Sequence, residues 1–179
     1  MRSPSIACSL MFCLLVARPV WATDQQDLSV ALKTLPLLTN KMTSPTAIAI
    51  VYNPASAASR EDAESIKSII DGGLEAPGGI KLLARLTSTE ELSGLSAVKI
   101  AFMAHELPET DYGRVNEAAS KAGVLTICTD IGCVKANKCV LGVVSRPQVV
   151  VYYSPVAAEA AKIGFAAAFT MLVKQVGSM

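Results

Sequence analysis

Hydrophobic residues recur along most of the chain in short continuous runs, and these runs alternate with segments of helical periodicity. The run from Thr46 to Tyr52 is apolar and β-branched and ends at the turn-forming pair Asn53-Pro54, which predicts a strand buried on both faces. Similar runs predict strands at Ile80 to Leu86, Ala97 to Met103 and Val124 to Thr129. Strands of this kind are typical of a parallel sheet covered by helices.

The segments between the strands predict helices. The first covers Asp27 to Leu35 and ends at Pro36. The second covers Ser59 to Ile70, with Ser59 as its expected N-cap and Asp62 in the place of the glutamate of a capping box. The acidic residues of this helix, Glu61, Asp62 and Glu64, lie beside Lys67 and predict a solvated face.

Later helices are expected from Ser88 or Thr89, over Tyr112 to Ala122, over Ala157 to Lys162, and over Ala166 to Gln175. In the last of these, Phe169, Leu172 and Val173 are expected to dock on the sheet.

A β-hairpin is predicted late in the chain. Its strands are Val140 to Val144 and Val149 to Tyr153, and it turns at Ser145-Arg146-Pro147. Strands that alternate with helices imply right-handed βαβ units, to which the hairpin would add an antiparallel edge. The pattern therefore predicts a single α/β domain of three layers, with a mostly parallel sheet, helices on both faces and a C-terminal antiparallel hairpin.

The amino-terminal residues 1–22 have the pattern of a cleaved signal peptide. Arg2 precedes an apolar run from Ile6 to Ala17, which is shorter than the ~18–20 residues of a membrane-spanning helix, and Ala22 is a small residue at the expected cut. We expect residues 23–179 to form a periplasmic domain without membrane insertion. Loss of Arg2 and Arg18 would change the formal net charge of +1 to −1.

Composition and motifs narrow the function. The chain of 179 residues is 51% hydrophobic and 17% charged, which predicts a folded domain without the basic surface of a nucleic-acid binder. His105 is the only histidine, and no serine or cysteine nucleophile motif accompanies it. We therefore expect an exposed loop histidine, no catalytic residues, no enzyme activity and no cofactor.

Cleavage of the signal peptide would leave three cysteines. Cys133 and Cys139 flank a polar loop from Asp130 to Lys138 that can fold back, and an exported compartment is oxidising. We predict a disulfide between these two residues and a buried free thiol at Cys128, which lies in a predicted strand. The C-x4-C-x5-C spacing lacks the close pairs typical of structural zinc, so no metal site is expected.

The carboxy-terminal third of the chain resembles the YfiR-like family (domain of unknown function 4154). The resemblance lies in Ala122 to Ile127, Cys133 to Cys139, Val140 to Val144, Val149 to Val151, Ala157-Ala158 and Ile163 to Phe165. It implies a periplasmic regulator that represses a membrane-bound diguanylate cyclase by contact with its periplasmic domain, and so tunes cyclic-di-GMP signalling and biofilm formation. It also implies a structural or redox-responsive disulfide between Cys133 and Cys139. We expect such a protein to form a homodimer.

A second class of protein fits the same pattern. An exported α/β lobe is similar to half of a periplasmic solute-binding protein of an ABC-transporter-like system. Its ligand would lie beyond the strand ends, near Asn53, His105 and Asp130, where α/β folds place their binding groups. These residues could equally form a loop that contacts a protein partner.

Overall fold

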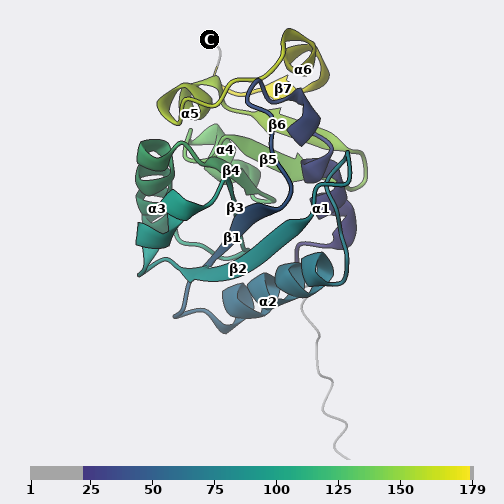
Figure 1. Cartoon of the computed structure of the whole chain (residues 1–179). Coiled ribbons are helices and arrows are strands. Elements are labelled where there is room, and N and C mark those ends of the chain that lie inside the picture. Colours follow the sequence, from purple (N-terminus) through teal and green to yellow (C-terminus); the bar gives the residue numbers. More distant parts are fainter. Residues whose placement is uncertain (1–21, 178–179) are drawn as a thin grey trace, which may run out of the picture.

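The computed structural model describes residues 22–177 and contains a seven-stranded sheet (Figure 1). The strand order is β2-β1-β3-β4-β5-β6-β7, and the only antiparallel neighbours in this sheet are β5 and β6. The strands are β1 (Thr46–Tyr52), β2 (Leu82–Ser88), β3 (Ile100–Met103), β4 (Leu125–Cys128), β5 (Leu141–Val144), β6 (Val150–Tyr153) and β7 (Lys174–Gln175).

Helices cover both faces of this sheet, which confirms the predicted three-layer α/β fold. In Figure 1, α1 and α3 lie on opposite sides of the strands. The helices are α1 (Gln25–Leu32), α2 (Ala57–Asp71), α3 (Glu109–Ala122), α4 (Ile131–Lys135), α5 (Pro155–Ala160) and α6 (Ala167–Leu172), with 3-10 turns η1 (Leu35–Leu37) and η2 (Leu92–Ala97). Among the described residues, no helix is both long enough and apolar enough to span a membrane.

Strand β1 explains why the sequence shows a continuous apolar run there. Ile48 and Ile50 pack into a core with α1 and α2, whereas Ala49 and Val51 pack into a second core with α3 and η2. Because side chains alternate between the two faces of a strand, a strand covered on both sides needs apolar residues at every position.

Helix α1 begins two residues earlier than predicted. Asp24 is its N-cap, because the Asp24 carboxylate accepts the Asp27 N–H at 2.9 Å and the Asp27 carboxylate accepts the Asp24 N–H at 3.1 Å. This reciprocal arrangement satisfies backbone donors that the helix itself leaves free.

The predicted start of α2 was wrong. Ser56 caps the helix, and its hydroxyl oxygen accepts the Ser59 N–H at 3.1 Å. Ser59 and Asp62 are therefore inside the helix, and both are buried rather than exposed. Glu61 and Glu64 are exposed as expected, but Lys67 pairs with Asp71, one turn further along.

Two further predictions differ from the structure after α2. Strand β2 is displaced two residues beyond the predicted range, and the helix expected from Ser88 or Thr89 is only the 3-10 turn η2. Strand β2 is the sheet edge, where Leu83 is 57% exposed, so the apolar pattern there was a weak guide to its bounds.

The carboxy-terminal segment contains a strand that the sequence did not predict. Helix α6 ends at Leu172, and β7 then pairs with β6, so the hairpin is not the edge of the sheet. Phe169 is buried as expected, whereas Leu172 is 74% exposed. The polar loop between the cysteines also contains a short helix, α4, which Asp130 caps by accepting the Gly132 N–H at 2.8 Å.

Candidate functional site

The carboxyl ends of β3, β4 and β5 border a surface cavity of about 560 Å³. His105 follows β3, Thr129 and Asp130 follow β4, and Ser145 begins the turn after β5. Because these strands are parallel, the residues that follow them meet at the side of the sheet where the strands end. We call this side the carboxyl edge. The cavity is lined by Ala22, Asp24, Asp27, His105, Thr129, Asp130, Ile131, Val143, Val144, Ser145 and Arg146.

The structure brings together two of the three residues predicted to form a binding loop. His105 and Asp130 both line the cavity, and His105 is half-buried rather than fully exposed. Asn53 is not among the lining residues, although it follows β1. Its side-chain oxygen accepts the Ala55 N–H at 2.9 Å and its own N–H donates to the Ser59 hydroxyl at 3.1 Å, so Asn53 forms the turn into α2.

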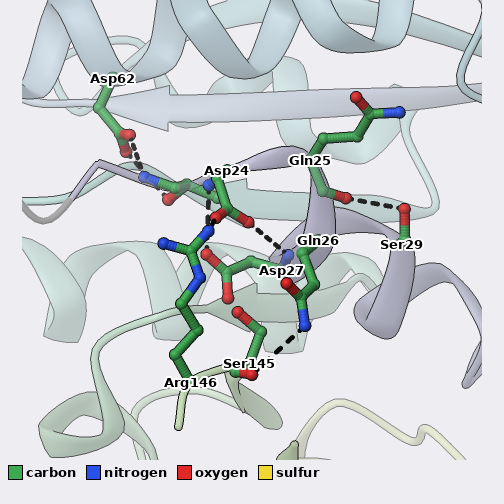
Figure 2. Close-up of polar contacts among 9 residues, drawn as sticks. Asp24, Gln25, Gln26, Asp27, Ser29, Asp62, Ser145 and Arg146 are labelled. Carbon is green, nitrogen blue, oxygen red and sulfur yellow. Dashed lines mark hydrogen bonds and ion pairs between the residues drawn. The ribbon is translucent and has the colours of Figure 1, made fainter.

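Three carboxylates and one guanidinium give the cavity its charge. Among the described residues that line it, Asp24, Asp27 and Asp130 are acidic and Arg146 is basic, and Arg146 forms an ion pair with Asp24. Figure 2 shows Arg146 extending from the hairpin turn toward the start of α1. The Gln26 side-chain amide donates to the Ser145 carbonyl at 3.4 Å and makes a second link between the same two segments.

Sequence reasoning did not identify Asp24, Asp27 or Arg146 as site residues, although signals for them existed. Asp24 and Asp27 have the spacing of a capping box. A hairpin that leaves β5 must turn at the same sheet edge at which β3 and β4 end, which places Arg146 there.

Asp130 is oriented by a residue of α3. The Tyr112 hydroxyl donates to one Asp130 oxygen at 3.1 Å, while the other oxygen caps α4. Burial raises the pKa of Tyr112, and the negative charge on Asp130 raises it further, so this hydroxyl stays protonated and remains a donor.

Asp62, on α2, joins the start of the described chain to this edge of the sheet. It is 3% exposed and accepts the Thr23 N–H at 2.7 Å, the Thr23 hydroxyl at 3.2 Å and the His105 N–H at 2.7 Å. Figure 2 shows the Asp62 carboxylate directed at the chain just before Asp24. Burial raises the pKa of Asp62 even though these hydrogen bonds oppose the shift.

The buried position of Asp62 could have been predicted. Ser59, Ala63, Ile66 and Ile70 recur at helical spacing and mark the inner face of α2, and Asp62 falls on that face. The capping-box interpretation concealed this, because it treated Asp62 as a residue of an exposed first turn.

The three cysteines lie at the end of β4, in α4 and just before β5. Cys133 and Cys139 form the predicted disulfide, with Cα atoms 5.4 Å apart, and Cys128 is a buried thiol. The Cys128 thiol donates to the Asp130 carbonyl at 3.0 Å, and burial raises its pKa. The three sulfur atoms lie within 4.8 Å of one another, but the disulfide leaves only Cys128 able to act as a thiolate ligand.

A second cavity, of about 490 Å³, lies at the opposite side of the sheet, where the strands begin. We call this side the amino edge. It borders the starts of β1, β3 and β4, through Thr46, Lys99 and Leu125. Lys41 also lines it, and none of its lining residues within the described chain is acidic. The two edges of the same sheet therefore carry cavities of opposite charge.

No protein-family model and no curated protein matches this chain. Its fold is similar to that of CD0873, a substrate-binding protein with adhesive properties from Clostridium difficile, in a ligand-free, open structure; the TM-score is 0.59 at 10% identity, over 86% of this chain and 59% of that one. A conserved domain protein from Vibrio cholerae gives a TM-score of 0.55 at 15% identity, over 87% of this chain and 61% of that one.

A third structure is the ABC domain from Streptococcus pneumonia in complex with L-Trp. Its TM-score is 0.56 at 13% identity, over 84% of this chain and 61% of that chain. At these identities the likeness concerns the fold alone. The chain spans about three fifths of the length of each of the three structures.

Proposed function

We propose that the chain is an exported, non-enzymatic binding protein that holds a small solute at the carboxyl ends of β3, β4 and β5. The observation that carries this proposal is the cavity of about 560 Å³ at that edge, with its polar groups drawn from separate segments of the chain. Pockets of this size at the strand ends of α/β sheets are the usual place for small ligands. The names of two similar structures, a substrate-binding protein and an L-Trp complex, support the same class.

The charges of the cavity favour a solute that carries an ammonium group. Three carboxylates exceed the one guanidinium, so the site has an excess of negative charge. An amino acid meets both kinds of group: its ammonium would bind Asp27 and Asp130, and its carboxylate would replace Asp24 on Arg146. Charge-assisted contacts of this type are stronger than neutral hydrogen bonds.

Calorimetric titration with a panel of amino acids, and with matched amines and carboxylic acids, tests the proposal. We expect binding by amino acids, weaker binding by amines and none by simple acids. Asp27→Asn should weaken amino-acid binding by about 10- to 100-fold, since a hydrogen bond to a charged group contributes about 1.5–3 kcal/mol. Lys99→Ala, at the opposite edge, is the matched control and should bind normally. Equal affinities in both variants would contradict the assignment of the site.

The YfiR-like regulator that the carboxy-terminal resemblance implies is a second proposal, and it predicts that the loop closed by the disulfide contacts a protein partner. The bond is buried, but the loop that it closes has exposed residues, including Lys135 and Ala136. A membrane signalling protein, such as a diguanylate cyclase, would then contact this loop. Affinity capture from envelope extracts distinguishes the candidates. Recovery of such a cyclase by the disulfide-bonded protein, but not by the protein with its disulfide reduced, favours the regulator.

A further inference from the structure

Within the described part of the chain, Asp62 is a buried carboxylate with no lysine or arginine partner. Among residues 22–177, the ion pairs of Lys and Arg involve Asp24, Asp71, Glu109, Asp111 and Glu117, and none reaches Asp62. Its close donors are two backbone N–H groups and one hydroxyl. A buried carboxylate normally has a positive partner, because desolvation otherwise disfavours its charged form.

The nitrogen atom of Thr23 is in the position where such a partner is needed. It lies 2.7 Å from Asp62 Oδ1, and Thr23 is only 4% exposed. The preceding residue, Ala22, is exposed, so the bond between the two residues lies where the chain passes from the surface to the interior. This bond is also the one at which the signal-peptide pattern predicts cleavage.

We propose that cleavage between Ala22 and Thr23 creates a buried ion pair between the new α-ammonium group of Thr23 and the Asp62 carboxylate. Hydrolysis of the peptide bond uses one water and converts the Thr23 amide nitrogen into a primary amine, which takes up a proton at neutral pH, since its ordinary pKa is about 7.7–8.0. The inference rests on the export part of the proposed function and does not depend on the solute.

Both members of the ion pair would contact residues that line the candidate site. Asp62 also accepts the His105 N–H, and the Thr23 hydroxyl lies 3.3 Å from the Thr129 hydroxyl. Both His105 and Thr129 line the cavity at the carboxyl edge. A charged amino terminus would therefore tie α2 to the ends of β3 and β4, and the exported form would have a more rigid binding edge than its precursor.

Insertion of one glycine after Ala22 tests the inference. The exported variant then begins at Gly, its Thr23 nitrogen is an amide, and the charge is displaced by one residue. We expect its Tm to fall by about 3–6 °C, because a charge-assisted contact becomes a neutral one. Mass spectrometry of the native protein must give Thr23 as the first residue; a different start overturns the inference, whether or not the protein binds a solute.

Asp62→Asn, made in both the native and the glycine-extended chain, completes a double-mutant cycle. With the carboxylate neutralised, the two chains should melt within about 1 °C of each other. A glycine insertion that lowers Tm by the same amount with and without Asp62→Asn would contradict the ion pair. Equal Tm values for the native and glycine-extended chains that both keep Asp62 would contradict it as well.

The rate of acetylation of the α-amine is a further test, and it does not require the Asp62→Asn variant to fold. Limited acetylation at neutral pH should modify the α-amine of the native chain about tenfold more slowly than that of the glycine-extended chain, since one unit of pKa changes the free amine fraction tenfold. Acetylation of exposed lysines such as Lys121, which is 75% exposed, should be the same in both proteins. Equal rates at the two α-amines would overturn the inference.

Discussion

The two edges of the sheet differ in what their loops contain, although the same strands end at both. At the carboxyl edge, Asp24, Asp27, Asp130 and Arg146 line one cavity, and side-chain contacts tie α1 to the hairpin turn, α2 to the loop after β3, and α3 to the loop after β4. At the amino edge, Lys41 and Lys99 line a cavity of similar size without a carboxylate. Its Lys41 side chain donates to the Pro36 carbonyl of its own loop at 2.8 Å.

This difference is the reason for placing the proposed binding site at one edge of the sheet and not at the other. Parallel strands place separate loops at both edges. At the carboxyl edge the charged side chains of Asp130 and Arg146 are held by residues of other segments, whereas the Lys41 side chain at the amino edge bonds within its own loop. Groups fixed in this way lose less conformational freedom when a ligand binds. Changes at the carboxyl edge should therefore alter binding, and matched changes at the amino edge should not.

The largest expected effect comes from the disulfide. Replacement of Cys133 and Cys139 together by Ser should lower the free energy of unfolding by about 2 kcal/mol, the value expected for closure of so short a loop. The corresponding fall in Tm is about 4–8 °C. Because α4 is capped by Asp130, the freed segment should also loosen the carboxyl edge and weaken ligand or partner affinity severalfold.

Thermal melting and calorimetric titration below the transition check this prediction, with circular dichroism to show that the sheet persists. Lys99→Ala in the same double-serine background is the control for the amino edge. A lower Tm with unchanged affinity would mean that the bond serves stability alone.

A smaller effect is expected from Tyr112→Phe, which removes the hydroxyl that donates to Asp130. The loss of this hydrogen bond should cost about 1 kcal/mol and lower Tm by about 2–4 °C. Since burial raises the pKa of Tyr112 above its ordinary value of about 10, the folded state favours the protonated hydroxyl. The stabilisation is therefore fully present below pH ~10 and is lost as the pH rises above that value.

Melting curves at pH 7 and pH 11 measure both parts of the Tyr112 prediction. The difference in Tm between the wild type and the Phe variant should be larger at pH 7. The converse, a difference that grows with pH, would show that the hydroxyl is not held as a neutral donor.

The regions that the sequence predicted well are those whose pattern has one structural explanation. The run from Thr46 to Tyr52 is apolar at nearly every position because β1 faces two cores, and the predicted bounds agree with the observed strand. The disulfide followed from a short loop with cysteines at both ends. The signal for such features lies in neighbouring residues, so the local sequence is enough to predict them.

The errors arise where distant segments decide the outcome. The helical spacing of α2 is enough to predict that Asp62 is buried, but its donors come from Thr23 and His105, and neither residue is near it in sequence. Strand β7 has two residues and exists because β6 offers an unpaired edge. Asp24 and Arg146 meet only after α1 and the hairpin have packed against the same sheet, so the most charged part of the site could not be assembled from local patterns.

The smallest effect on stability is expected from Arg146→Gln. The Arg146 side chain is 71% exposed and its partner Asp24 is 32% exposed, and ion pairs in this setting contribute about 0–1 kcal/mol. The Tm should fall by less than about 3 °C. Asp24 keeps its place as the cap of α1, because its other oxygen accepts the Asp27 N–H, so the edge itself should be preserved.

Binding by this variant should distinguish the contribution of the solute's carboxylate from that of its ammonium group. An amino acid loses the contact between its carboxylate and the guanidinium, so its affinity should fall by about tenfold, the scale of one charge-assisted hydrogen bond. An amine without a carboxylate should bind as well or better, because Asp24 is released from its ion pair. Lys99→Gln, which removes a positive charge at the amino edge, is the control. If both variants lowered amino-acid affinity equally, the effect would be one of net charge, and the contrast between the two edges would fail.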